Sequence, residues 1–205
     1  MEIALTRRAP PAVKHGSYFK DPAVEMDEAG AAKAEAYYES RKGMNYYQTV
    51  LAVVNSLSYR TILDVGSRRS PVLEALPPSK ERVTLDRLAV HSPAGIRHVV
   101  ADFTTWVPDK RYELVLCLQV LEHLEQPAEF LQKLFATGND VIVSVPYRWK
   151  RGFCKYHVQD PVTLSKVVGW AGGRKPVAYW IVEDNKLKRL ICLYRGVLKL
   201  STPHC

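Results

Sequence analysis

The sequence predicts an α/β protein: a doubly wound, seven-stranded and mostly parallel sheet that closes with a C-terminal antiparallel hairpin and carries helices on both faces. Three observations support this. Short apolar runs alternate with helical segments between residues 61 and 169, acids end three candidate strands, and two apolar runs near the C-terminus flank a polar turn. Strands that alternate with helices are typical of a parallel sheet built from βαβ units.

The N-terminal part divides into an arm and two helices. Residues 1–26 mix charge, proline and glycine without periodicity, which predicts a flexible arm. Residues 27–205 are predicted to form a single domain. An Ala- and Glu-rich helix is expected over Glu28–Ser40, ended by Gly43, and a second helix with an apolar stripe over Asn45–Leu57.

The sheet is expected from residue 61 onward. The predicted strands are Thr61–Val65, Arg82–Leu85, Ile96–Val100, Tyr112–Leu118 and Val141–Val145, with a hairpin of Val177–Val182 and Leu187–Tyr194 around the turn Glu183–Lys186. The predicted helices are Pro71–Leu76, Pro127–Ala136, and one that begins at Asp160-Pro161 and ends at Gly169. Ser70 suits the N-cap of the first helix because Pro71 then takes its first position. The fourth and fifth strands are almost wholly apolar, as expected of strands buried on both faces.

Composition narrows the class of protein. Among the 205 residues, 47% are hydrophobic and 24% charged, the balance of a soluble globular chain. No apolar stretch approaches the roughly 20 residues that span a bilayer, and the basic N-terminus lacks the apolar run of a secretory signal. We therefore expect a cytoplasmic location. The four cysteines are far apart with no C-x-x-C pair, which disfavours a zinc site or a disulfide framework.

The net charge of +8 is unevenly distributed. Residues 148–205 hold twelve Lys and Arg against three Asp and Glu, whereas residues 1–147 hold seventeen against eighteen. A basic last third could attract an anionic substrate or a nucleic acid. The same charges could also form the solvated surface of the final hairpin, and the sequence leaves these alternatives open.

Acids end three of the candidate strands. Asp86 follows Asp64 by 22 residues, and Asp102 ends the third strand. A carboxylate at the end of the second strand can accept hydrogen bonds from both hydroxyls of a ribose. The alternative is that Asp86 and Asp102 only cap their loops. Gly66 is followed by Ser-Arg-Arg-Ser, not by the further glycines of a dinucleotide fingerprint, so NAD and FAD are disfavoured and an adenosyl ligand without pyrophosphate fits better.

Two segments then resemble a known family. Ile62–Ser67 resembles the first motif of the class I (Rossmann-like) S-adenosylmethionine (SAM)-dependent methyltransferases. Val120–Leu124 resembles the "LEH" segment of their small-molecule branch, the ubiquinone-biosynthesis type. The resemblance runs in motif order from about Thr61 to Val145, and the closing hairpin is similar to that family's seven-stranded sheet. It implies SAM as the cofactor.

The resemblance also implies roles for individual residues. Asp86 would bind the ribose, Asp102 the adenine amino group, and Gly66 would lie against the methionine half of SAM. The implied cofactor-binding residues are Asp64, Gly66, Ser67, Arg68, Asp86, Arg87, Asp102, Phe103, Leu118 and Gln119. Arg68 stands where the family usually has a glycine. The helices over residues 27–58 would form a lid with Tyr37, Tyr38, Tyr46 and Tyr47, although these rings could equally pack on the sheet.

Histidines are the candidate catalytic groups. His123 and His157 follow the fourth and fifth strands on the same side of the sheet, and either could deprotonate or orient an acceptor. His123 could instead only brace its loop. Glu122, His123 and His157 also suggest a divalent ion, because some family members bind one through Glu-x-x-Glu-His and a later His. Here Gln119 replaces the first carboxylate, so no metal is expected.

The predicted function is methyl transfer from SAM to a small molecule, at an oxygen of a sugar or a secondary metabolite. Histidine-assisted deprotonation of the acceptor is the expected mechanism. One alternative is an RNA methyltransferase that holds phosphates with the basic C-terminal third. The other is a non-catalytic SAM-binding partner protein, which the unusual Arg68 favours.

Overall fold

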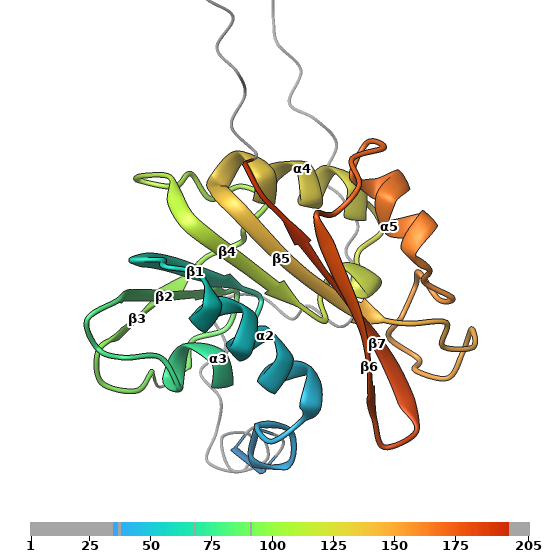
Figure 1. Cartoon of the computed structure of the whole chain (residues 1–205), viewed down its shortest axis with the longest axis horizontal. Coiled ribbons are helices and arrows are strands. Elements are labelled where there is room, and N and C mark those ends of the chain that lie inside the picture. The colour runs from blue at the N-terminus through green and yellow to red at the C-terminus, as the bar shows by residue number, and fades with distance from the viewer. Residues whose placement is uncertain (1–34, 37, 68, 91, 197–205) are drawn as a thin grey trace, which may run out of the picture.

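A computed structural model of the chain describes residues 35–36, 38–67, 69–90 and 92–196; the predicted arm over residues 1–26 lies outside them. Its centre is a seven-stranded sheet in the order β3-β2-β1-β4-β5-β7-β6 (Figure 1). Strands β1 to β5 are parallel, and β7 runs antiparallel to both of its neighbours, β5 and β6. The predicted sheet and its closing hairpin are therefore confirmed.

The predicted strands are all present. They are β1 (Thr61–Val65), β2 (Glu81–Asp86), β3 (Ile96–Val100), β4 (Tyr112–Leu118), β5 (Gly138–Pro146), β6 (Ala178–Asp184) and β7 (Leu187–Tyr194). Strand β5 begins at Gly138, earlier than predicted, because this glycine both ends the preceding helix and lies against β4. A Cβ at Gly138 would come 2.6 Å from Val115 Cγ2, so a larger residue would not fit there.

The hairpin turn is tighter than predicted. Glu183 and Asp184 belong to β6, and only Asn185 and Lys186 form the turn, with φ angles of 51° and 64°. Two consecutive residues with positive φ match the right-handed twist of the flanking strands, and asparagine tolerates this conformation well. The polar run Glu183–Lys186 therefore predicted the position of the turn correctly, but the turn itself is two residues shorter than that run.

The helices are α2 (Asn45–Ser56), α3 (Pro71–Glu74), α4 (Pro127–Thr137) and α5 (Leu164–Trp170), with a short 3-10 helix η1 (Leu121–His123). Residues 35–36 and 38–41 are also helical. Ser70 caps α3 as predicted, since its Oγ accepts a hydrogen bond from the Leu73 N–H at 3.2 Å. The start of α5 was predicted wrongly. The Asp160 carboxylate binds His157, and Thr163 caps the helix instead by accepting a bond from the Lys166 N–H.

Helices cover both faces of the sheet (Figure 1). Helices α2 and α3 pack on one face, where Val50, Val54 and Leu73 meet the β4 residues Leu114 and Leu116. Helices α4 and α5 pack on the other face. There Leu131, Leu134 and Val167 meet Val115 and Cys117. Cys117 and Cys192 are buried thiols, as their apolar surroundings in the sequence suggested. Within the described ranges, no helix is long and apolar enough to cross a membrane.

Candidate active site

The turn after β1 is held against the chain that follows β4. Gly66 has a φ of 77°, and its N–H donates to the Leu85 carbonyl at 2.7 Å. A Cβ on Gly66 would lie 2.8 Å from Val120 Cγ2. Both the backbone angle and the close approach therefore require glycine. The first motif and the "LEH" segment, far apart in the sequence, thus meet at the carboxyl edge of the sheet, the edge where β1 to β5 end.

Asp64 is a buried acid beside this turn. It is 1% exposed, and burial raises its pKa to about 7; the Ser70 hydroxyl lowers that pKa and the charge of Asp86 raises it. Asp64 Oδ1 is buried without a hydrogen-bond partner among the described residues. A buried polar atom left unpaired costs free energy, so this oxygen fits a site where a polar ligand supplies the missing bond.

The other two strand-end acids lie on the same edge. The Asp86 carbonyl accepts a bond from the Ala101 N–H at 2.9 Å, which joins the ends of β2 and β3. Asp86 Oδ1 accepts a bond from Leu88 N–H at 3.0 Å, and Asp102 Oδ1 accepts bonds from the N–H and hydroxyl of Thr104 at 2.9 and 2.7 Å. Each acid thus holds its own loop with one oxygen, which fixes the orientation of its carboxylate. Asp102 Oδ2 lies 3.8 Å from Arg87 Nε.

The remaining residues implied for the cofactor differ in their surroundings. Phe103 is 3% exposed, and its ring packs 4.9 Å from the ring of Phe130, in the core under α4. Leu118 is 7% exposed at the end of β4. Gln119 has a φ of 59°, and its N–H and side-chain amide both bond Ser144, at 2.8 and 3.1 Å. A non-glycine residue in this conformation is uncommon and occurs where the chain must turn sharply. Arg68 lies outside the described residues.

His123 and His157 lie together, with ring centres 4.8 Å apart in an edge-to-face arrangement. His123 Nδ1 is 3.0 Å from the Tyr156 carbonyl, and His157 Nδ1 is 2.8 Å from Asp160 Oδ2. Because a carbonyl can only accept, Nδ1 of His123 carries the hydrogen and Nε2 of the neutral ring keeps a lone pair. An ionised Asp160 imposes the same tautomer on His157. The bracing role suggested for His123 is real, and it leaves Nε2 able to take a proton.

Burial sets the protonation of this cluster. It lowers the pKa of His123, with a further decrease from the neighbouring His157 and a partial offset from the bond to Tyr156. A lowered pKa keeps His123 neutral, and therefore basic, near pH 7. Glu122 is 1% exposed, and burial raises its pKa to about 8. Its Oε2 has no hydrogen-bond partner among the described residues, and its Oε1 lies 3.9 Å from His123 Nε2.

The same cluster has the composition of a divalent-cation site. One ligand atom from each of Glu122, His123 and His157 lies within 4.8 Å of the others. Both histidines bond an outer carbonyl or carboxylate through Nδ1, an arrangement that typically orients metal-binding imidazoles. The sequence placed these residues at one edge of the sheet and suggested a divalent ion, but Gln119 in place of the family's first carboxylate argued against a metal. Gln119, which replaces the family's first carboxylate, is occupied with Ser144.

An aromatic and cationic wall continues from the histidines. The Trp149 ring stacks on His157 at 5.5 Å, and the guanidinium of Arg189 lies 5.6 Å from the Trp149 ring and 4.9 Å from the Tyr46 ring. Arg189 is 2% exposed and pairs with Asp184 at 3.2 Å. Trp149 and Arg189 were not predicted as site residues. Trp149 lies between Arg148 and Lys150, and Arg189 follows Lys188, so both stand in basic runs typical of a solvated surface.

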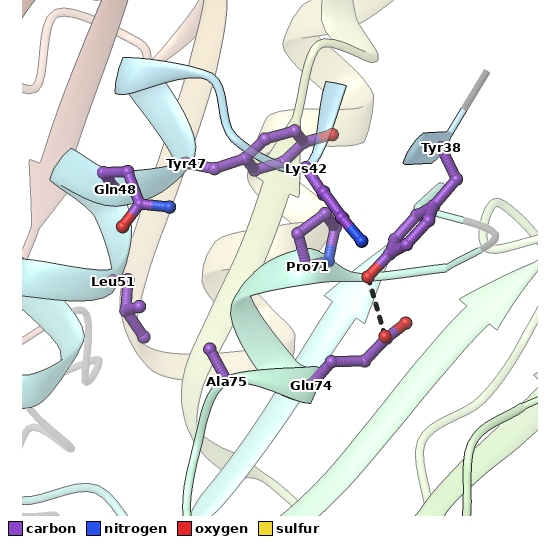
Figure 2. A pocket seen from close by; sticks show the side chains of 8 residues that line it. All are labelled: Tyr38, Lys42, Tyr47, Gln48, Leu51, Pro71, Glu74 and Ala75. Carbon is purple, nitrogen blue, oxygen red and sulfur yellow. Dashed lines mark hydrogen bonds between the residues drawn. The ribbon is translucent and has the colours of Figure 1, made fainter. Parts of the chain in front are cut away.

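The predicted lid is partly described. Tyr46 is 1% exposed and packs in the core between α2 and the sheet, which is the alternative to a lid role given for these rings above. Tyr37 lies outside the described residues. Tyr38 lines a cavity of about 250 Å³ (Figure 2). The other residues that line it are Lys42, Tyr47, Gln48, Leu51, Pro71, Glu74 and Ala75. This volume lies just below the usual range for small-molecule pockets.

A clasp joins the lid helix to α3. We use this name for Tyr38, Arg69 and Glu74. The Tyr38 hydroxyl donates to Glu74 Oε2 at 2.7 Å (Figure 2), and the guanidinium of Arg69 donates to both oxygens of Glu74 at 3.0 and 2.9 Å. Arg69 also stacks on the Tyr38 ring at 3.7 Å. Since Arg69 lies just after the Gly66 turn, the clasp fixes the lid helix next to the expected cofactor loop.

The fold occurs in known structures. The chain resembles the 1,6-didemethyltoxoflavin-N1-methyltransferase of Burkholderia thailandensis, solved with 1,6-didemethyltoxoflavin and S-adenosylhomocysteine, with a TM-score of 0.62 at 14% identity. That match covers 82% of this chain and 84% of the other. The chain has the fold of the class I SAM-dependent methyltransferases. The "LEH" branch indicated by the sequence is compatible with this methyltransferase fold.

Two further solved structures share the methyltransferase fold. One is the N-methyltransferase NodS of Bradyrhizobium japonicum with S-adenosylhomocysteine, with a TM-score of 0.57 at 13% identity, over 74% of this chain and 85% of that one. The other is the magnesium protoporphyrin IX methyltransferase of Synechocystis with bound SAM, with a TM-score of 0.53 at 15% identity, over 74% of this chain and 78% of that one.

Sequence comparison gives a partial match. The chain is 31% identical over 122 residues to the probable (S)-tetrahydroprotoberberine N-methyltransferase 2 of Papaver bracteatum. The match covers 58% of this chain and 34% of the relative, so the chain spans about a third of the curated relative's length. No family model matches the sequence.

Proposed function

We propose that this chain transfers a methyl group from SAM to a small-molecule acceptor, and that the accepting atom is an oxygen. The observation that supports the methyl transfer from SAM is the unpartnered buried Oδ1 of Asp64 beside the Gly66 turn. It lies at the carboxyl ends of parallel strands, where doubly wound folds bind nucleotide-like ligands. The structural neighbours solved with SAM or S-adenosylhomocysteine share this fold.

In this proposal, each of the three strand-end acids binds a different part of SAM. Ionised Asp64 at the Gly66 turn would attract the ammonium group of the methionine half. Asp86, held by the Leu88 N–H through one oxygen, would accept the ribose hydroxyls, and Asp102 would face the adenine amino group. When bound, SAM supplies an activated methyl group whose carbon–sulfur bond breaks as the carbon–oxygen bond forms, leaving S-adenosylhomocysteine.

The histidines support oxygen as the acceptor atom. A hydroxyl must lose its proton as it attacks, and a neutral imidazole of suitable pKa accelerates such a transfer by about 10²–10⁴-fold. Asp160 holds His157 at 2.8 Å and so keeps the lone pair on Nε2, which receives the hydroxyl proton. His123 sits beside it, and its lowered pKa keeps it neutral at pH 7.

The Asp160→Asn substitution tests this mechanism. An amide can offer its N–H to His157 Nδ1, which favours the wrong tautomer, so we expect kcat to fall by about 10²-fold or more. The assay is release of S-adenosylhomocysteine from SAM with a panel of hydroxyl and amine acceptors. The Kd for S-adenosylhomocysteine should stay within about threefold, because Asp160 does not touch the cofactor region. Turnover of amines alone, unaffected by this substitution, would contradict an oxygen acceptor.

A second candidate is the same transfer assisted by a divalent cation. It is favoured by the meeting of Glu122, His123 and His157 and by the unpartnered Oε2 of Glu122. A bound cation would polarise an acceptor oxygen, and these three side chains would hold it. Titration with Mn²⁺ and Zn²⁺ after treatment with a chelator separates the candidates. Activity that disappears with the chelator and returns with the ion supports the cation; activity that persists supports the histidines alone.

The two alternatives from the sequence, an RNA methyltransferase and a non-catalytic SAM-binding protein, gain no support. RNA methylation requires affinity for RNA that falls steeply with salt, because Lys and Arg contacts release counterions from the phosphates. A non-catalytic partner protein would bind SAM and release no product with any acceptor. Both are outcomes of the same turnover and binding assays.

A further inference from the structure

The loop between β5 and α5, residues 147–159, combines four cations with no acid. Arg148, Lys150, Arg151 and Lys155 are all exposed, and no Asp or Glu occurs in the loop. Among the described residues it also holds three of the eight exposed large hydrophobic side chains, namely Phe153 at 60%, Tyr156 at 37% and Val158 at 54%. Cationic and apolar groups are thus offered side by side on one short segment.

This loop is anchored at both ends. Tyr147 N–H and the indole N–H of Trp149 both donate to the Lys188 carbonyl on β7, at 2.9 and 2.8 Å. At the other end, the N–H groups of Val158 and Gln159 donate to the Glu122 carbonyl in η1, at 3.0 and 3.2 Å. A ring contact also stabilises the loop, because the rings of Phe153 and Trp149 pack with their centres 5.2 Å apart. The cations are therefore presented by a fixed segment with its own hydrogen bonds.

The same loop builds the candidate active site. His157 belongs to it, and its Tyr156 carbonyl orients His123 at 3.0 Å. Lys155 stands two positions before His157 and contacts the Tyr156 ring at 4.7 Å. Any molecule that brings an oxygen to the histidines therefore approaches a surface that is positive and partly apolar.

We propose that the acceptor is an organic anion, with a carboxylate or phosphate group that the loop 147–159 binds while an apolar part packs on Phe153 and Tyr156. This inference rests on the proposed function, because it names the substrate class of the same site. Charge complementarity carries it: four cations and no acid face solvent on the loop.

The nearby acids do not cancel this charge. Asp160 pairs with His157 at 2.8 Å, and Asp184 pairs with Arg189 at 3.2 Å. Glu122 is 1% exposed, so its carboxyl group does not face an incoming anion. None of the three presents a free negative charge to an incoming anion.

A small anion is favoured over a nucleic acid by the layout of the cations. The four cations lie on one short loop beside the histidines and do not form an extended track across the sheet edge. A polymer needs a track of phosphate contacts along an extended surface, and its affinity would show that as a steep salt dependence.

The test measures anion binding directly, without waiting for the natural acceptor. The probes are phenyl phosphate and phenylacetate, two sources of the anionic group, with 2-phenylethanol as the neutral match. Calorimetric titrations use the full chain, with and without saturating S-adenosylhomocysteine. The loop variant is Arg151→Glu with Lys155→Glu. The control is Arg60→Glu with Lys175→Glu, which changes one exposed Arg and one exposed Lys just before β1 and β6, at the opposite edge of the sheet.

We expect saturable binding of at least one anion, at least about tenfold tighter than 2-phenylethanol, and about tenfold weaker in the loop variant. The control variant should stay within about twofold. Equal affinity for the neutral probe, no binding of either anion, or equal losses in both variants would overturn the proposal. A single-stranded RNA that is methylated in preference to all small anions would also overturn it. A chain that binds no S-adenosylhomocysteine refutes the proposed function separately, since anion binding is also measured without it.

Discussion

Asp64 shows how one residue links the sequence pattern to the proposed chemistry. In the sequence it stands near the end of an apolar run, where we expected a cofactor-binding residue. In the structure it is buried, and its Oδ1 has no hydrogen-bond partner among the described residues. Burial and the charge of Asp86 bring its pKa to about 7, so its ionisation changes close to neutral pH. A cationic ligand prefers the ionised form.

The first prediction follows for cofactor affinity. Between pH 5.5 and 7.5, where the ammonium group of SAM stays largely protonated, the affinity for SAM should rise by about tenfold as Asp64 ionises. Asp64→Asn should bind more weakly and lose this pH dependence. Calorimetric titration at several pH values measures both effects. An unchanged pH profile in the variant would show that another group is responsible.

The second prediction concerns Glu122 and the pH dependence of the free energy of unfolding. Its folded pKa of about 8 lies above the value near 4.3 of an exposed glutamate. The unfolded chain therefore releases this proton first, and the free energy of unfolding should decrease as pH rises from about 4.5 to 8. Glu122→Gln should remove on the order of 2 kcal/mol of that decrease. Urea denaturation at pH 5 and pH 8 tests this, and identical pH slopes in the two proteins would contradict it.

Contacts that depend on loop geometry could not be predicted from the sequence. Gly66 and Asp86 were predictable because a strand end fixes their place on the sheet. The approach of His157 to Glu122 depends on the path of residues 147–159, which no spacing rule gives. Arg189 was missed because a cation next to Lys188 in a strand is expected on the surface, whereas here Asp184 and two aromatic rings make its burial possible.

At the scale of elements, the clasp determines how the lid helix meets α3. Tyr38 and Arg69 share the carboxylate of Glu74, and the three groups span the segment just after the Gly66 turn. Partly buried, shared hydrogen bonds to a charged group are worth more than an exposed ion pair. The clasp should therefore hold the lid in place when a ligand binds below it.

The third prediction concerns this clasp. Glu74→Gln keeps the shape of the side chain and removes its charge, so the affinity for S-adenosylhomocysteine should fall by about threefold to tenfold through a faster dissociation rate. Stopped-flow fluorescence or surface-based kinetics can separate the two rate constants. Glu183→Gln, an exposed acid of β6, serves as the matched control. Equal dissociation rates for all three proteins would exclude a role for the clasp.

Element boundaries were less predictable than element types. Every predicted strand exists, and the central strands β1, β4 and β5 are almost wholly buried, as their apolar runs predicted. The start of α5 was misplaced because two N-cap candidates compete, and Asp160 is already bonded to His157 while the Thr163 hydroxyl is available to Lys166 N–H. Tertiary contacts therefore decided between two local signals of similar strength.

At the scale of the whole molecule, the hairpin and helix α2, the second helix of the predicted lid, depend on each other. Asp184, next to the hairpin turn, accepts bonds from the N–H groups of Asn45 and Tyr46 at 2.6 and 3.3 Å, which places a negative charge at the N-terminus of α2. Such a charge stabilises the first turn of a helix. The last two strands thus help to fix the lid as well as to close the sheet, a long-range link that local sequence patterns do not contain.

The central claim is that the acids of β1, β2 and β3 form one adenosyl-binding site at the carboxyl edge of the sheet. Titration of the chain with S-adenosylhomocysteine, compared with Asp86→Ala and with Asp109→Ala as a control acid at the opposite edge, tests this most directly. The account predicts saturable one-to-one binding, weakened by about 10²-fold in Asp86→Ala and unchanged in the control. Absent binding, or equal affinity in all three proteins, would contradict it.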